Sequence, residues 1–320
     1  MYQYIARRIF LFIPTMILAT ILVFALFWIV PGDAAMMILT GEEGEGGRVS
    51  AQELQNLRAK LGLNRPVYVQ YGDWLWDVLR GDLGTSLWYR VPVIDELKDR
   101  FPVTLELAVM AILMAFVVAV PLGIISAVKQ DTGVDYASRV FTLIGVAMPN
   151  FWVGILMIYA LAYFFGWLPP LGYATLWDDP LTNLKQLVFP AMALAFGDMA
   201  FTARVTRSTM LEVLREDYMR TARSKGLNEV AVVGRHALKN ALLPVITISG
   251  YQFGRLLGGV IIIESIFVVP GVGRFLVDAI IHRDFIVLQG IILLTAAAIL
   301  LLNLVIDLFY GVLDPRIRYN

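Results

Sequence analysis

Few residues of this chain are able to do chemistry. Among its 320 residues there is no cysteine, and the only histidines are His236 and His282. The sequence therefore offers no thiol nucleophile, no disulfide, and no cysteine or histidine metal centre. Neither histidine lies in an apolar segment, so an intramembrane enzyme would lack a serine–histidine or histidine–carboxylate set. We predict no catalytic residue and no metal ligand.

Nucleotide chemistry is also not expected of this chain. The pattern G-x-x-x-x-G-K-[ST], whose backbone cradles phosphate groups, is absent, and the glycines at 44–47 and at 258–259 are not followed by the required lysine. We expect no cofactor in this chain. Basic and acidic residues balance at 26 each, so nothing indicates a nucleic-acid partner.

The remaining candidates are charged residues within or beside apolar segments: Glu106, Asp198, Arg255, Glu264 and Asp307. Ionisable side chains at membrane depth usually face the interior of a helix bundle or an aqueous path. Two interpretations stay open for Asp198 and Arg255, which either line a substrate route or form an interhelical or interfacial pair. Glu264 and Asp307 lie at the ends of apolar segments, where we expect them to be solvated or capped.

The elements that position these residues are predicted to be membrane helices. Hydrophobic residues make up 58% of the chain and charged residues only 16%, whereas a soluble domain carries about a quarter charged residues, because its surface must be solvated. A membrane helix needs about 20 mostly apolar residues. Kinks are expected at Pro149-Asn150 and at Gly254 with Gly258-Gly259. Six segments qualify as spans: Ile9–Val30, Leu107–Val128, Val140–Phe165, Gln186–Ala203, Ala241–Ile263 and Phe285–Ile306.

Basic residues set the orientation of these spans. Most of them lie in the segments that share a side with the N-terminus, and the short loops on the other side hold only Lys185, Arg274 and Arg283. By the positive-inside rule, both termini are cytoplasmic. Residues 1–30 are then the N-terminus and first span, and residues 311–320 the cytoplasmic C-terminus.

Residues 31–102 are predicted to form an external helical insert after the first span. Ser50 and Glu53 have the spacing of a capping box, and Gly62 offers a stop for the helix that they begin. A second amphipathic run, rich in aromatic residues, follows Pro66. The insert is either a small packed cap over the span ends or a docking surface for an external partner, and the two interpretations are compatible.

The second hydrophilic segment, residues 204–239, lies between the fourth and fifth spans. Gly226 offers a helix stop and Asn228 can cap a second helix, so we predict a helix, a sharp turn and a helix. This compact knob either anchors on anionic lipid or docks on a protein. An apolar residue at every fourth position predicts a stripe on one helix: Met210, Leu214, Tyr218 and Ala222.

Several blocks of this sequence, in their order along the chain, resemble those of a known protein family. They are Pro31-Gly32-Asp33, LGLNRP at 61–66, RGDLG at 80–84, DYMRTARSKGL at 217–227, RHALKNALLP at 235–244, ESIFVVPGVGR at 264–274 and the stretch 307–319. Together with the spans they resemble permease subunits of binding-protein-dependent ABC importers, in the dipeptide/oligopeptide (nickel, glutathione) branch. The likeness covers nearly the whole chain.

The resemblance implies a role for the 204–239 loop. In that family the corresponding loop fits a groove on a cytoplasmic ATPase and passes nucleotide-driven closure to the spans. Aligned with the family's Glu-Ala-Ala…Gly motif, Ala222, Gly226 and Leu238 match, and four residues depart: Arg220, Thr221, His236 and Lys239. The implied ATPase-coupling residues are Asp217, Ala222, Gly226 and Leu238.

The resemblance also implies the architecture and the partners. It implies a type I ABC importer permease fold, with the permease domain at 103–310, in a prokaryotic plasma (inner) membrane. A second homologous permease would complete a heterodimer within membrane lipid, two ATPases would bind ATP-Mg, and an external binding protein would deliver di- or oligopeptides.

Other substrates and one other class stay open. Nickel chelate, glutathione and oligosaccharide importers share the scaffold. An ion-coupled secondary transporter would use the intramembrane acids as a proton relay. It would however have only six spans and no visible inverted repeat.

Overall fold

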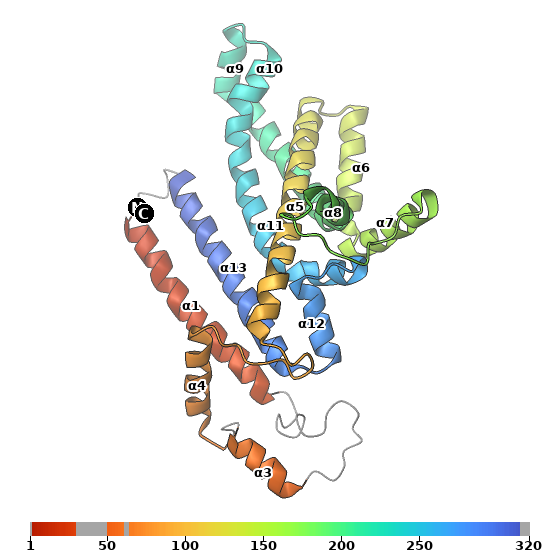
Figure 1. Cartoon of the computed structure of the whole chain (residues 1–320). Helices are drawn as coiled ribbons and strands as arrows, with labels where there is room; N and C mark the ends of the chain where they lie inside the picture. Colours follow the sequence, from red (N-terminus) through yellow and green to blue (C-terminus); the bar gives the residue numbers. More distant parts are fainter. Residues whose placement is uncertain (1, 30–49, 61–63, 314–320) are drawn as a thin grey trace. The chain divides into compact units, whose positions relative to one another are not determined.

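The computed structural model describes residues 2–29, 50–60 and 64–313, and every regular element in this part of the chain is a helix (Figure 1). The all-α prediction is confirmed for these residues. The Pro31-Gly32-Asp33 turn, the stop at Gly62 and the block from Asp314 onward lie outside them. The chain divides into two compact units, Met1–Phe101 with Phe275–Asn320, and Pro102–Arg274.

Four helices of the described chain are long and apolar enough to cross a membrane alone. They are α1 (Tyr2–Ile29), α5 (Val93–Val128), α8 (Pro180–Leu214) and α13 (Phe285–Leu313). Two further helix pairs, each bent at a short break, raise the number to six if each pair is one span. The structure therefore supports a polytopic membrane protein with four to six apolar spans.

The predicted third span, Val140 to Phe165, is two helices in the structure. They are α6 (Gly133–Ala147) and α7 (Asn150–Phe165), and they meet at an angle of 106° (Figure 1). Between them Met148 has extended backbone, with φ −86° and ψ 128°. A residue before proline is disfavoured in the helical region, and Pro149 lacks the N–H that would continue the helix.

The predicted fifth span bends where its glycines lie. Helix α11 (Leu238–Phe267) contains the break between Leu256 and Val260, where the helical path turns by 59°. Gly258 lies within this break, and a Cβ added to it would meet no atom within 4 Å. The predicted kink at this position is confirmed.

In the first unit, the second helix of the predicted insert packs onto α1. Helix α3 (Ala51–Lys60) begins with the predicted capping box: the backbone N–H of Ser50 donates to Glu53 Oε2 (3.1 Å), and that of Gln52 donates to Ser50 Oγ (3.2 Å). In α4 (Val67–Leu79), Tyr71 shares a 2.8 Å hydrogen bond with Thr20 of α1. The rings of Tyr71 and Trp74 lie 5.5 and 5.6 Å from the ring of Phe24.

The same unit joins the segment before α5 to the segment before α13. The buried Asp284 carboxylate accepts a hydrogen bond from Ser86 Oγ (2.6 Å) and caps α13 through the N–H of Val287 (3.2 Å). The ring of Trp88 stacks on His282 with centroids 4.2 Å apart. These contacts pack the segment before α5 against the segment before α13.

In the second unit, α8 packs against α6, α7 and α11. Small residues permit the close approach of these helices. A Cβ on Gly145 of α6 would lie only 2.4 Å from the Cβ of Ala200, and one on Gly123 of α5 would lie 2.6 Å from the Cβ of Thr206. Helix α8 is therefore the central element on which the candidate site is built.

Candidate functional site

The 204–239 loop forms a helix–turn–helix knob at one end of the second unit (Figure 1). Helix α9 (Asp217–Ser224) is followed by Gly226 with φ +77°, a left-handed conformation that favours glycine. The Asn228 side chain accepts the N–H of Ala231 (2.8 Å) and so caps α10 (Glu229–Ala231). A π-helical turn, Val232–Ala237, then leads into α11. The predicted turn and cap are confirmed.

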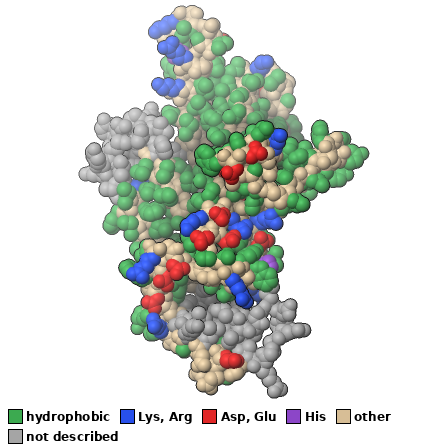
Figure 2. All heavy atoms as spheres, in the orientation of Figure 1, with side chains coloured by type: hydrophobic (Ala, Val, Ile, Leu, Met, Phe, Trp, Pro, Cys, Tyr) green, Lys and Arg blue, Asp and Glu red, His purple; other side chains and the backbone are tan. Residues whose placement is uncertain are grey.

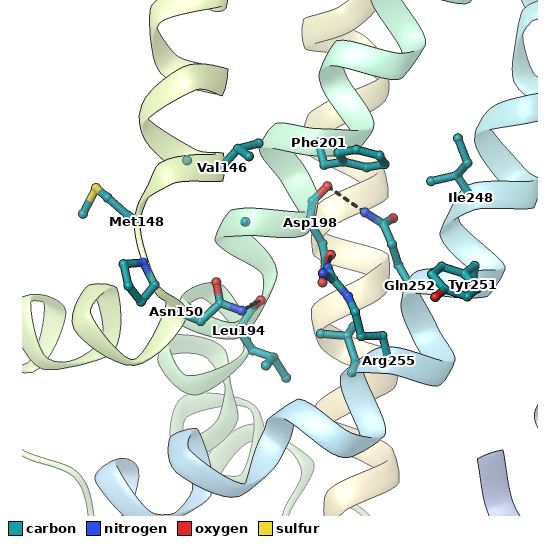
Figure 3. A pocket seen from close by; sticks show the side chains of 14 residues that line it. Val146, Met148, Asn150, Leu194, Asp198, Phe201, Ile248, Tyr251, Gln252 and Arg255 are labelled. Atoms are coloured by element: carbon teal, nitrogen blue, oxygen red, sulfur yellow. Dashed lines mark hydrogen bonds and ion pairs between the residues drawn. The ribbon is translucent and has the colours of Figure 1, made fainter.

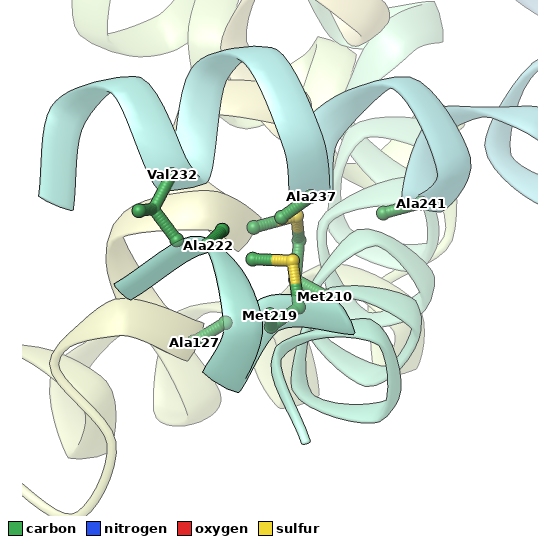
Figure 4. Packing of buried hydrophobic residues seen from close by; sticks show 7 residues of the cluster. All are labelled: Ala127, Met210, Met219, Ala222, Val232, Ala237 and Ala241. Carbon is green, nitrogen blue, oxygen red and sulfur yellow. The ribbon is translucent and has the colours of Figure 1, made fainter. Parts of the chain in front are cut away.

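The predicted single helix through this loop is wrong. Helix α8 ends at Leu214, and the extended backbone of Glu216 (ψ 147°) separates it from α9. The four residues of the predicted stripe therefore do not share one helix. A buried cluster from several elements takes its place: Ala127, Met210, Met219, Ala222, Val232, Ala237 and Ala241 (Figure 4).

The four implied coupling residues occupy different environments. Ala222 is 6% exposed and packs within this cluster, so contacts inside the chain already explain its small side chain (Figure 4). Asp217 and Gly226 are exposed, and Leu238 is half-buried at the start of α11. The surface that a partner can reach is therefore formed by the turn and not by Ala222.

The tip of the loop, residues 223–230, is exposed throughout. It presents two apolar side chains, Leu227 (40% exposed) and Val230 (82% exposed). Arg223 Nε donates to Glu229 Oε1 (2.7 Å) across the turn, and this carboxylate raises the pKa of Arg223. Figure 2 shows basic side chains gathered on this knob. Sequence reasoning missed Leu227 and Val230, although apolar residues flanking a turn in a charged segment were a usable signal.

Asp198 and Arg255 form an ion pair between α8 and α11 (Figure 3). The two side chains differ in exposure, because that of Asp198 is 1% exposed and that of Arg255 is 65% exposed. Gln252 of α11 donates to the Asp198 backbone carbonyl (3.4 Å) and accepts from Thr202 Oγ1 (2.9 Å). Asp198 Oδ2 is buried with no hydrogen-bond partner among the described residues.

The pair borders a cavity of about 540 Å³ that lies entirely in the second unit. Its walls come from the α6–α7 junction, from α8 and from α11 (Figure 3). The Met148–Pro149 break, where α7 turns away from α6, lies in one wall. Most of the remaining lining is apolar, including Val146, Leu194, Phe201 and Ile248.

The other predicted intramembrane charges have partners. Glu264 is completely buried and not solvated, and its carboxylate accepts Thr104 Oγ1 (2.6 Å) and the N–H of Arg274 (3.1 Å). In the first unit, Arg8 Nη1 lies 2.6 Å from Asp307 Oδ2. Glu106 accepts the Tyr173 hydroxyl (2.8 Å), and burial together with this carboxylate raises the pKa of Tyr173.

Sequence reasoning missed a second buried pair at the base of the 204–239 loop. Asp135 of α6 is completely buried and binds Arg207 of α8 at two points. No pattern connected these residues, since 72 positions separate them. Among the described residues, no group of three His, Cys, Asp or Glu side chains is placed to hold a metal ion.

Comparison with known proteins assigns the class. The family described as "Binding-protein-dependent transport system inner membrane component" matches residues 119–319, and the corresponding N-terminal family matches residues 1–108. The chain belongs to this family of membrane transport permeases, which are not enzymes. The resemblance inferred from the sequence is confirmed.

The similar proteins include full-length relatives. The chain is 40% identical over 316 residues to a putative peptide transport system permease protein of Brucella abortus (strain 2308), covering 99% of each chain. It is 42% identical over 343 residues to the dipeptide transport system permease protein of Escherichia coli (strain K12), covering all of both. A crystal structure of an amino acid ABC transporter with histidines matches at TM-score 0.54 and 16% identity, over 68% of this chain and 94% of that one. This last likeness shows the fold alone.

Proposed function

We propose that this chain is one permease subunit of an ATP-driven importer that carries di- or oligopeptides from an external binding protein into the cell. The full-length similarity to peptide permeases supports the substrate class. The observation that carries the coupling role is the exposed tip at 223–230, where Leu227 and Val230 are exposed beside the Gly226 turn. Apolar side chains on a rigid, charged knob suit a groove on a protein better than a lipid surface, which basic residues alone would serve.

The proposed topology has six spans, with α6–α7 and α11 each counted as one span. Both termini (residues 1–30 with the first span, and 311–320) are cytoplasmic, and residues 31–102 are an external helical insert. The permease domain is 103–310. The positive-inside distribution of arginine and lysine supports this orientation.

The proposed assembly contains a second, homologous permease, two ATPases that bind ATP-Mg, and the binding protein, in the inner membrane. Large apolar side chains remain exposed along the helices of this chain, for example Leu113 (58%), Val117 (67%) and Leu143 (69%). Lipid or another permease must cover them. Six helices also enclose a path poorly, which favours a two-permease pore.

Transport by purified, reconstituted complex tests this function. The genes neighbouring this one are co-expressed, and the complex is placed in proteoliposomes with its binding protein. We expect uptake of labelled dipeptide that needs ATP and the binding protein and is inhibited by vanadate. One copy each of two different permeases should co-purify. Uptake driven by an ion gradient without ATP, or uptake of nickel chelate, glutathione or oligosaccharide in place of peptide, would contradict the proposal.

A further inference from the structure

The ion pair between Asp198 and Arg255 is built asymmetrically. The Asp198 side chain is closed off from solvent, whereas the Arg255 side chain is 65% exposed and borders the cavity. Only Nη2 of Arg255 is engaged, by Asp198 Oδ1, and no other acceptor among the described residues binds this guanidinium. A guanidinium has five N–H donors in a planar fork that matches a carboxylate. The donors that remain are therefore available to an anion in the cavity.

The surroundings of Arg255 fit the rest of a peptide. Ile248, Tyr251 and Arg255 recur on α11 at helical spacing and so share the face that borders the cavity. The opposite walls supply apolar surface from Met148, Leu194 and Phe201 (Figure 3). A volume of about 540 Å³ lies within the range of sites for small ligands. The cavity thus pairs one anion-binding group with an apolar wall for side chains.

We propose that this cavity binds the terminal carboxylate of the transported peptide through Arg255, and that buried Asp198 is the counter-ion that positions Arg255. The inference rests on the proposed function and adds a site to it. An arginine exposed at membrane depth is costly against lipid, which favours an aqueous path beside it. Because Asp198 offsets the charge of Arg255, Arg255 holds the terminal carboxylate of the peptide weakly. Weak binding is what release of the peptide along a transport path requires. A pair that served only to join α8 and α11 has no need of an exposed guanidinium.

The first test replaces the pair by neutral groups of similar shape. Removing Arg255 alone would leave a buried carboxylate unpaired, so the variant is the double Asp198→Asn/Arg255→Gln. The external binding protein is loaded with peptide and added at a saturating concentration. Its affinity for the peptide therefore does not affect the comparison between variant and wild type. We expect uptake per purified complex to be lower by about tenfold, the scale of one charge-assisted hydrogen bond. Arg255→Lys, which keeps the charge, should retain most of the uptake. Wild-type uptake by the double variant would overturn the inference.

A second test reads binding without altering the pair. The chain contains no cysteine, so Tyr251→Cys introduces a unique thiol beside the cavity. Excess dipeptide with a free terminal carboxylate should protect this thiol from a maleimide in the detergent-purified complex. The same dipeptide with a C-terminal amide should not. Leu243→Cys, on the same helix but away from the cavity, is the matched control and should label at one rate throughout.

The outcomes separate this inference from the proposed function. Equal protection by the two dipeptides, or protection by neither, would overturn the carboxylate site while wild-type uptake still supports a peptide permease. If the wild-type complex takes up no peptide at all, the proposed function fails first. Protection of Tyr251→Cys by the free carboxylate alone supports the site.

Discussion

Asp135 and Arg207 are joined by a two-point ion pair across 72 residues of sequence, with Nε 2.7 Å from Oδ1 and Nη2 2.8 Å from Oδ2. Ser126 Oγ (2.6 Å) and the N–H of Asp131 (3.1 Å) donate to the same carboxylate. The pair fixes α6 and the end of α5 to α8, one turn before Met210 enters the buried cluster of the 204–239 loop. We infer that it holds the base of this loop in place.

Loss of this pair should destabilise the protein strongly. Asp135→Asn leaves Arg207 partly buried without its anion, and breaking a buried pair costs about 3–5 kcal/mol. The measurement is the free energy of unfolding of the purified complex. Arg139→Gln is the control, because Arg139 lies 3.9 Å from the same carboxylate but is 48% exposed. It should cost less than about 1 kcal/mol. An equal loss of stability in Asp135→Asn and Arg139→Gln would contradict a dominant role of the two-point pair.

The tip of the 204–239 loop should couple the permease to its ATPase. Val230 is 82% exposed and has no place in the core of the chain, so Val230→Asp should leave insertion and folding intact. We expect weaker ATPase capture on pull-down by about tenfold or more, with uptake and stimulated ATP hydrolysis falling together. Ala222→Leu should instead lower the thermal stability of the permease itself, because it overfills the buried cluster.

Gly226→Asp combines backbone strain with charge at the same tip. At φ +77° a residue with a side chain costs about 1–2 kcal/mol, and Gly226→Ala carries this strain without the charge. We expect uptake to fall further in Gly226→Asp than in Gly226→Ala. If both variants assemble and transport normally while Arg215→Ala or Arg223→Ala fails, the loop acts as a lipid anchor and not as an ATPase dock.

The block at 264–274 should depend on Gly271 for a steric reason. A Cβ at Gly271 would lie 2.2 Å from the Glu264 Cδ, and the buried Glu264 cannot leave without losing its hydrogen bonds to Thr104 and Arg274. Gly271→Ala should destabilise the complex by about 1–3 kcal/mol in thermal unfolding. Gly258→Ala, where a Cβ meets nothing within 4 Å, is the matched control and should not.

Two cysteines test the proposed orientation. Asn56→Cys, exposed on α3, should react from outside the cell with a membrane-impermeant thiol reagent, whereas Glu229→Cys at the loop tip should react only after the membrane is opened. The absence of native cysteine keeps the background clean. The reverse pattern would invert the topology.

The features that the sequence determined are those set by neighbours along the chain. Apolar length predicted the four long apolar helices, the Ser50–Glu53 spacing predicted the cap of α3, and Gly226 with Asn228 predicted the turn of the 204–239 loop. Each depends on backbone geometry or hydrogen bonds over a few residues. The family resemblance was equally readable, because its blocks are local strings.

Tertiary structure decided what depends on residues distant in sequence. Periodicity predicted that Ala222 lies on one long helix. In the structure the chain breaks at Glu216, and Ala222 packs with Val232 and Ala237 in the buried cluster of the loop. No spacing rule linked Asp135 to Arg207, or showed that Asp198 is closed off while Arg255 is exposed. Whether a charged side chain faces a cavity depends on how the helices cross. Helix crossing is set by contacts such as that between Gly145 and Ala200, which no local pattern encodes.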